Sequence, residues 1–363
     1  MYKKFFMGIA AMAALTLVSC SSDDLNSLSD NSSKNEAISF DGYLGRSAVA
    51  VNGSRASELN VTALQNSAEG FGVFGNYKED DGQEFGSGLF NNQKVTYKAS
   101  AWTYSPLKFW PEQGHIDFLA YAPYDANTAL TDSKFKIVFT VDKEIAKQKD
   151  LLWANAVDQT KDNISSTGKK VKFHFYHALS RLGYSVKLYG DYTSNNVKFT
   201  LKEITLAGSS DDETKGAFYT SGTIDLSKGN KDEGIWSNQA GQQKFDWFSG
   251  DYQVNSSTAS HPDGNREKDK DYLFVIPQDF SQDGNTLYVK VKYTITYTDG
   301  GTQTITNTVY KKLTTNFKQG KAYMLNLTIG LPIEFDVDVD GVEGWGTDEE
   351  INIGSNDNPW NRQ

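Results

Sequence analysis

The chain has 363 residues, of which 46 are acidic and 36 are basic, so its formal net charge is −10. This acidic excess argues against a nucleic-acid partner, because such affinity comes mainly from lysine and arginine neutralising phosphates. The single cysteine excludes a disulfide framework and a cysteine-based zinc site. Aromatic residues make up 13% of the chain, and the abundance of Tyr and Phe favours β-structure.

Residues 1–19 predict a secretory signal peptide. Two lysines precede an apolar run from Phe5 to Val18, which is too short to cross a bilayer. The only cysteine ends the sequence Leu17-Val18-Ser19-Cys20, which resembles the lipobox of bacterial lipoproteins. We therefore expect Cys20 to be lipidated; a free cysteine beside an ordinary cleavage site is the alternative. Residues 20–37 are mostly Ser, Asn and Asp and predict a flexible, lipid-anchored tether.

From Ile38 onward, apolar and polar residues alternate, which predicts antiparallel strands with one buried face. The clearest runs are Leu287–Tyr297 and Thr304–Val309, separated by Asp299-Gly300-Gly301, and they predict a β-hairpin. A phase break near Lys202-Glu203 predicts a β-bulge. Further strands are expected in Phe135–Val141, Val171–Phe175, Tyr184–Leu188, Val197–Leu206, Tyr323–Ile329 and Ile333–Val339.

Polar stretches divide this all-β chain. The stretch Asp158–Lys170 predicts a boundary between an N-terminal β-sandwich domain over residues 38–168 and a C-terminal one over residues 169–363. The stretch Gly208–Asp271, rich in Gly, Ser, Asn and Asp, predicts a long irregular loop with isolated aromatic residues. Helical signals are few, and one short helix is expected within Asp142–Trp153.

No motif for catalysis, cofactor binding or metal binding is recognisable, so we expect no enzyme activity and no cofactor. The sequence lacks a nucleophile elbow, a dinucleotide-binding loop and a phosphate-binding loop. Asp336, Asp338 and Asp340 are spaced like the first ligands of a calcium loop, but Thr347 stands where that loop needs a glutamate. A solvated acidic strand face is the favoured interpretation, and no metal site is predicted.

Short segments rich in aromatic residues recur along the chain. They are Trp102-Thr103-Tyr104, Phe109-Trp110-Pro111, Ile116–Pro123, Asp150–Ala154, Phe173–Leu182, Tyr272–Gln278 and Gly320–Tyr323. Each is a weak signal alone, but their order and the preceding lipobox together are fairly specific. In this combination the chain resembles the fimbrillin family of the Bacteroidetes, which comprises FimA- and Mfa-like pilins and related surface lipoproteins.

The resemblance implies a fold and a mode of assembly. The fold would be two antiparallel β-sandwich domains of transthyretin-like type, in agreement with the alternation. The chain would be exported as an outer membrane lipoprotein to the cell surface, held there by the lipid on Cys20. A trypsin-like protease would then cut beyond the first strand, and a strand of another fimbrial subunit would fill the opened groove. A host or bacterial surface receptor would be a further partner.

Several residues are candidates for this assembly. The first strand would contain Ile38 and Phe40, and the cut would follow Arg55, with Arg46 as the alternative site. Both arginines are equally compatible with plain loops in a subunit that is never cut. The C-terminal candidate strand, either donated to a neighbour or part of its own domain, contains Ile333, Phe335, Val337 and Val339. Stalk, anchor and tip roles all stay open.

A surface glycan-binding lipoprotein is the second interpretation. Exposed tryptophans would then stack on sugar rings, and the candidates are Trp236, Trp247 and Trp360. Packing within the core or a loop is the more usual role of such residues. An enzyme on the same scaffold is the third and least favoured interpretation.

Overall fold

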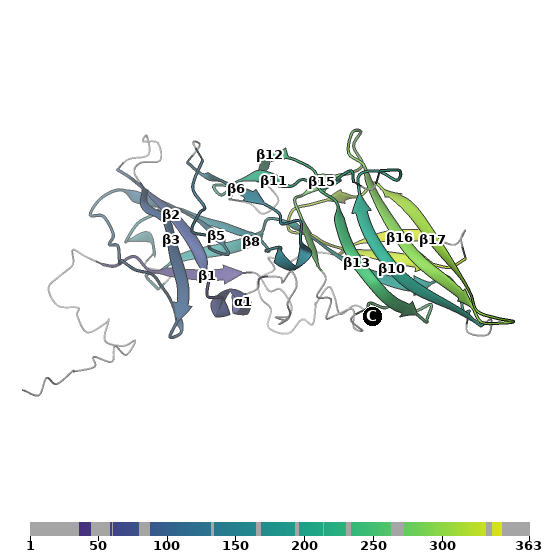
Figure 1. Ribbon diagram of the computed structural model, residues 1–363. Helices are drawn as coiled ribbons and strands as arrows, with labels where there is room; N and C mark the ends of the chain where they lie inside the picture. The colour runs from purple at the N-terminus through teal and green to yellow at the C-terminus, as the bar shows by residue number, and fades with distance from the viewer. Residues whose placement is uncertain are drawn as a thin grey trace, which may run out of the picture. The chain divides into compact units, whose positions relative to one another are not determined.

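Strands dominate the computed structural model, which describes residues 36–44, 59, 61–79, 88–131, 134–164, 168–192, 196–212, 214–229, 234–262, 272–331 and 336–342. Helical elements within these ranges include the α-helix α1 (Val61–Asn66) and the 3-10 helix η2 (Ile145–Lys147). The predicted all-β sandwich class is therefore confirmed (Figure 1). None of the described helices is long and apolar enough to cross a membrane.

Seven strands form the first sheet. In spatial order they are β1 (Phe40–Leu44), β8 (Val171–His177), β7 (Leu152–Gln159), β5 (His115–Ala122), β2 (Phe71–Lys78), β3 (Gly88–Lys98) and β4 (Ala101–Thr103). Neighbouring strands are antiparallel, except that β1 runs parallel to β8. Every residue of β5 is buried, because alternate side chains enter different hydrophobic clusters: Phe118 enters one, and Leu119 the other.

Two four-stranded sheets form a β-sandwich, which we call the C-terminal sandwich. One contains β13 (Phe245–Val254), β10 (Val197–Ala207), β16 (Leu287–Tyr297) and β17 (Gln303–Leu313). The other contains β14 (Leu273–Val275), β9 (Ser180–Leu188), β19 (Ala322–Ile329) and β20 (Asp336–Val342). Leu201, Val291 and Leu325 come from both sheets and share one hydrophobic cluster, as two sheets packed face to face require.

The predicted hairpin and the predicted bulge both lie in the C-terminal sandwich and are confirmed. β16 and β17 pair without a register shift along their whole length. β10 shifts register between Leu201 and Glu203 against both of its neighbours. An extra residue in one strand produces such a shift, which is why the apolar residues change phase there.

The long loop predicted over Gly208–Asp271 is wrong. This segment contains β11 (Ser221–Asp225), β12 (Trp236–Ala240) and β13, and β11 pairs with both β12 and β6 (Lys136–Thr140). The remaining two-stranded sheet pairs β15 (Gln278–Asp279) with β18 (Asn316–Phe317). Neither β12 nor the middle of β13 is buried, so these strands can carry many polar side chains. The sequence of the segment is therefore similar to that of a loop.

The short helix expected within Asp142–Trp153 is present only as a single 3-10 turn. The structure has only the three-residue η2 there, and Trp153 lies fully buried in β7. The Asp142 carboxylate accepts a hydrogen bond from the Glu144 backbone N–H at 2.8 Å. This contact makes a local turn, which competes with a helical start.

Two hydrophobic clusters form the core. One gathers buried residues between Ile38 and Phe175, and the other reaches from Ala178 to Val337 with some residues from the opposite face of the first sheet. The stretch Asp158–Lys170, predicted as the domain boundary, runs from the end of β7 to the start of β8, and both strands belong to the first sheet. The division into residues 38–168 and 169–363 stays a prediction.

Candidate assembly site around strand β1

Strand β1 lies at one end of the seven-stranded sheet, and the residues just before it also contact a second segment on the other side. On one side it runs parallel to β8 over its whole length. On the other side, Ile38 donates its backbone N–H to the Lys108 carbonyl at 2.8 Å, and Ala37 forms a bridge to Phe109. The strand is therefore held between β8 and the segment 104–109.

Two apolar side chains anchor β1, since Ile38 and Phe40 are each only 1% exposed. The centroid of the Phe40 ring lies 5.4 to 5.6 Å from four other rings, those of Phe90, Tyr104, Phe118 and Phe173. These edge-on, tilted and stacked contacts are favourable arrangements of aromatic rings. We call these four rings, with the backbone edges of β8 and of the segment 104–109, the β1 slot.

The slot also restricts side-chain size at Gly42. A Cβ atom added at Gly42 would lie 3.5 to 3.6 Å from Phe71, Trp102 and Phe175, which is ordinary contact. A methyl group fits there, but a larger side chain must displace rings of a close-packed core. The slot therefore accepts a strand with two apolar anchors followed by a small residue.

Tyr104 connects the slot to β1 by a hydrogen bond. Its hydroxyl donates to the Ile38 carbonyl at 2.7 Å and accepts from the Lys108 backbone N–H at 3.3 Å. Burial raises the pKa of the Tyr104 hydroxyl above its ordinary value, and the hydrogen bond with the Lys108 backbone offsets part of that rise. The hydroxyl thus ties the start of β1 to the segment 104–109.

We predict that Tyr104→Phe lowers the free energy of unfolding by about 1 kcal/mol, the usual net value of one hydrogen bond. The pKa of Tyr104 is higher in the folded chain than in the unfolded chain. The free energy that this group contributes to folding is therefore fully present below the ordinary tyrosine pKa, and it is lost as the pH rises through the pKa of the folded chain. Urea titrations at neutral pH and near pH 11 measure both effects. Tyr97→Phe is the control, since the Tyr97 hydroxyl makes no hydrogen bond to described residues; an equal effect of both variants would contradict the prediction.

The C-terminal candidate strand occupies an edge of its own sandwich in this structure. β20 pairs antiparallel with β19, and Val337 and Val339 lie opposite Leu327 and Leu325. Val337 is 6% exposed, and Val339 packs partly buried against the same cluster. Ile333 and Phe335 lie outside the described residues.

Both candidate cleavage sites, Arg46 and Arg55, lie outside the described residues, as does Cys20. The described chain ends at Leu44 in β1 and resumes at Leu59. The Leu59 backbone N–H donates to the Asp150 carboxylate at 2.9 Å, and Asp150 also pairs with the His177 ring at 2.9 Å. The segment that carries the two arginines therefore joins two anchored points.

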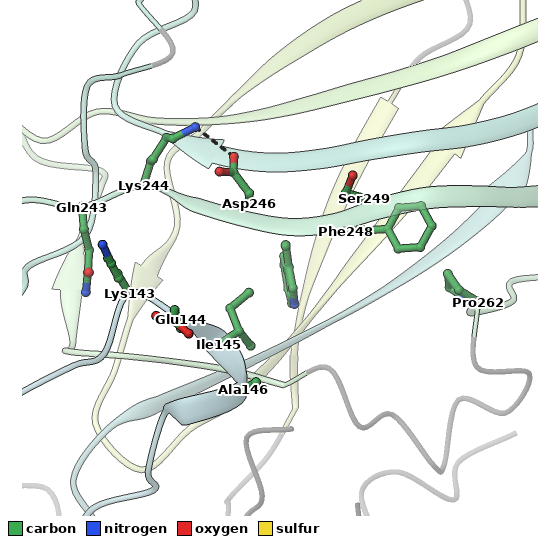
Figure 2. A pocket seen from close by; sticks show the side chains of 11 residues that line it. Lys143, Glu144, Ile145, Ala146, Gln243, Lys244, Asp246, Phe248, Ser249 and Pro262 are labelled. Atoms are coloured by element: carbon green, nitrogen blue, oxygen red, sulfur yellow. Dashed lines mark hydrogen bonds and ion pairs between the residues drawn. The ribbon is translucent and has the colours of Figure 1, made fainter. Parts of the chain in front are cut away.

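The tryptophans considered for glycan binding are mostly packed. Trp247 is 4% exposed, and Trp236 is partly buried with its indole N–H donating to the Ala178 carbonyl at 2.7 Å. Trp360 lies outside the described residues. Trp247 contributes to the wall of a hollow of about 690 Å³, where Figure 2 shows the Lys244–Asp246 ion pair on one side and the Phe248 ring on the other. Because Trp247 is so deeply buried, its indole ring offers little area for stacking on a sugar.

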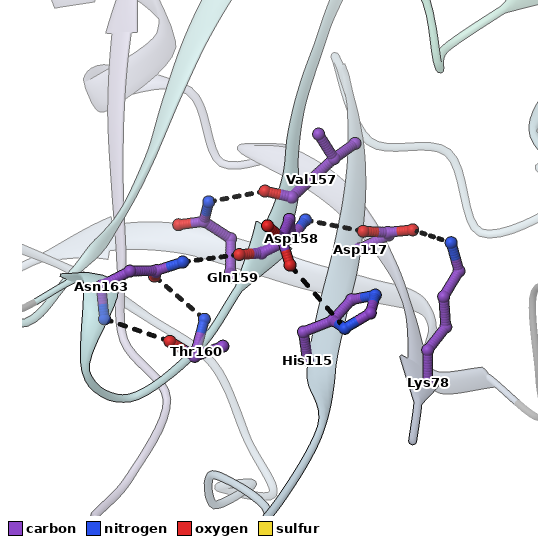
Figure 3. A network of polar contacts seen from close by, with 8 residues as sticks. All are labelled: Lys78, His115, Asp117, Val157, Asp158, Gln159, Thr160 and Asn163. Carbon is purple, nitrogen blue, oxygen red and sulfur yellow. Dashed lines mark hydrogen bonds and ion pairs between the residues drawn. The ribbon is translucent and has the colours of Figure 1, made fainter. Parts of the chain in front are cut away.

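A cluster of polar side chains joins β2, β5 and β7, and it has a structural explanation (Figure 3). Asp117 pairs with Lys78 at 2.6 Å and accepts the Asp158 backbone N–H at 2.7 Å. β5 and β7 shift register between Ile116 and Phe118, and Asp158 has a positive φ of 55°. The cluster therefore stabilises an irregular strand pair. Within the described part of the chain, no group of three His, Cys, Asp or Glu residues is arranged to hold a metal ion.

Comparisons with known proteins give a family match and several similar solved structures. A family model described as fimbrillin-like matches residues 54–360. A fimbrial protein from Bacteroides vulgatus is 22% identical with a TM-score of 0.61, and the alignment covers 86% of this chain and 100% of that chain. A candidate cell adhesion protein from Bacteroides uniformis is 16% identical with a TM-score of 0.45, covering 85% of this chain and 98% of that chain. The tip fimbrial protein Mfa3 from Porphyromonas gingivalis is 9% identical with a TM-score of 0.39, covering 79% of this chain and 96% of that chain.

A search of curated protein sequences finds no match. The likeness to the Bacteroides vulgatus protein indicates a shared fold, and the family match extends over most of the sequence, from just before Arg55 to Trp360. It includes the aromatic segments around the β1 slot. This chain belongs to the fimbrillin-like family.

Proposed function

We propose that this protein is a fimbrial subunit or accessory protein of the cell surface that assembles by strand exchange. β1 is removed by a cut after Arg55 or Arg46, and a strand of another subunit enters the β1 slot. Family membership supports the fimbrial role and the surface location. The observation that carries the mechanism is that an end strand with two buried anchors leads directly into the segment with both arginines.

Loss of β1 would leave a strongly unfavourable surface. The edge of β8 would lose its hydrogen-bond partner, and each buried polar group left without a partner costs about 1–3 kcal/mol. The rings that contact Phe40 would also be exposed to water. Both penalties are relieved when another strand with the same pattern of anchors occupies the slot.

The C-terminal segment is the proposed donor. Its sequence Ile333-Glu334-Phe335-Asp336 repeats the spacing of Ile38-Ser39-Phe40-Asp41. In β1, Asp41 lies opposite Lys172 of β8, so an aspartate at the same position of a donor would meet the same lysine. Val337 would take the place of Gly42, so the rings of Phe71, Trp102 and Phe175 would have to shift to admit its side chain.

The lipid anchor is a separate proposal. We predict that Cys20→Ser abolishes incorporation of labelled palmitate and releases the protein from the outer membrane, because the thiol is the attachment atom. Labelling of whole cells followed by immunoprecipitation measures this. Equal labelling of the wild type and the variant would contradict it.

Cleavage of the purified protein tests the assembly mechanism. A trypsin-like enzyme followed by concentration should yield a ladder of oligomers that resists mild detergent. The double variant Arg46→Ala, Arg55→Ala should give no ladder, whereas Arg266→Ala, in another segment outside the described residues, should behave as wild type. Protein that loses β1 yet stays monomeric at all concentrations would contradict strand exchange and favour the glycan-binding interpretation.

A further inference from the structure

β17 is an unusually open edge strand. It spans eleven residues, ends its sheet, and within the described residues pairs only with β16. Residues 303–310 contain no charge and no proline, and the pairing with β16 has no bulge. Charges, prolines and bulges are the devices by which natural edge strands avoid pairing with another chain. The outer backbone edge of β17 is therefore competent to accept a strand.

The inner face of β17 is only partly covered. Ile305 lies opposite Ile295 of β16 but is 49% exposed. Val309, two pairs further along the same face, packs partly buried against the core. This face therefore carries an apolar side chain that its own sandwich leaves in contact with water.

Asn307 lies between these two residues on the same face of β17. Its side-chain amide nitrogen is buried and has no hydrogen-bond partner in the described part of the chain. Buried polar groups almost always have a partner, so this exception requires an explanation. The chain's own atoms cover this nitrogen, so an acceptor on another strand would reach it only after the Asn307 side chain turns outward.

We propose that β17 pairs antiparallel with β17 of a second copy of the chain, about a two-fold axis at Asn307. In this register Ile305 faces Val309 of the second copy, and Thr306 faces Thr308. The two Asn307 residues meet at the axis, where each side chain, once turned outward, can donate its amide N–H to the amide oxygen of the other. Apolar pairs and threonine pairs directly across a strand pair are favourable.

Charge distribution fits this occupant. The lysines of β17, Lys311 and Lys312, lie near one end of the strand. The antiparallel register sets them opposite Gln303 and Thr302 of the second copy, so no like charges meet. A parallel arrangement in the same register would instead place Lys311 and Lys312 of one copy beside the same two lysines of the other.

The interface is a single strand pair, smaller than the roughly 1,200 Å² of a stable standard interface. We therefore expect a weak, reversible dimer of the isolated protein. In a fibre, repeated copies would add up to a strong lateral contact by multivalency, and this consequence rests on the proposed function. The dimer itself does not rest on it, because it needs no cut and no donor strand.

Cysteine crosslinking tests the register. The full chain carries Cys20→Ser, Arg46→Ala and Arg55→Ala, which remove the only other thiol and block β1 exchange. Under mild oxidation, Asn307→Cys should form at least ten times more covalent dimer than Thr304→Cys. In the proposed register the two Thr304 positions lie roughly 20 Å apart, since six residues separate them along the strand axis. Equal crosslinking of the two variants overturns the proposal.

Sedimentation velocity gives an independent test on the same background. Thr306→Lys with Thr308→Lys should raise the dimer dissociation constant at least tenfold, whereas Thr306→Lys with Thr308→Glu should retain dimerisation, because positions 306 and 308 face each other across the axis. Gln253→Lys, on the opposite edge strand β13, is the control and should have no effect. A full chain that is monomeric at all concentrations overturns the proposal. So does a chain that dimerises only after truncation at Val342, since its own C-terminal segment then covers the edge.

Discussion

Replacing Phe40 with alanine should lower the free energy of unfolding by about 3–5 kcal/mol, the usual cost of deleting a buried phenylalanine ring. Phe40 is 1% exposed, and its ring contacts Phe90, Tyr104, Phe118 and Phe173. These neighbours come from separate elements of a closed aromatic cluster, so they cannot collapse fully into the space left behind. The loss should also weaken retention of β1 after cleavage.

Urea unfolding followed by tryptophan fluorescence measures this change. Phe109→Ala is the matched control, because Phe109 lies beside the same strand but is 48% exposed. Its loss should change the stability by no more than about 0.5 kcal/mol. A Phe40→Ala variant as stable as the control would mean that β1 is not packed in the slot.

Removing the buried carboxylate of Asp150 should cost about 1–3 kcal/mol for each buried donor that loses its acceptor, and these donors are the His177 ring and the Leu59 backbone N–H. Asp150 and His177 are 1% and 3% exposed, and the carboxylate also accepts the Leu59 backbone N–H. Asp150→Ala therefore disrupts the end of β8 and the point where the chain resumes after the two arginines.

The control is an exposed ion pair in the same part of the fold. Glu69 pairs with Lys149 at 3.1 Å, and both side chains are about half exposed, so Glu69→Ala should cost less than about 1 kcal/mol. Guanidinium titrations of both variants give the comparison. Equal losses for Asp150→Ala and Glu69→Ala would contradict a structural role for the buried pair.

Local patterns in the sequence predicted much of the fold. The strict alternation of Leu287–Tyr297 and the glycines after it predicted the β16–β17 hairpin, and the phase break predicted the bulge in β10. The hairpin and the bulge can both be recognised because each depends only on residues that are close together in the sequence. The polar composition of Gly208–Asp271 hid β12 and β13, because strands that remain largely exposed have no alternation to detect.

The β1 slot could be predicted only in part. Alternation identified Ile38 and Phe40 as anchors, and Tyr104 and Phe173 fall within the aromatic segments. No local pattern, however, indicates that β1 runs parallel to β8, about 130 residues further along the chain. The same limit applies to Asp150 and His177, whose contact depends on how β7 and β8 meet. Contacts between distant segments are set by the packing of the whole sheet.

The central claim is that assembled chains have lost β1. The most direct measurement is mass spectrometry of the N-termini in a detergent-resistant ladder isolated from the native cell surface. The account predicts that chains in the higher oligomers begin at Ala56 or Ser47, after the candidate arginines, and that peptides containing Phe40 are absent from these oligomers. Oligomers whose chains all retain lipidated Cys20 and the Phe40 peptide would contradict it.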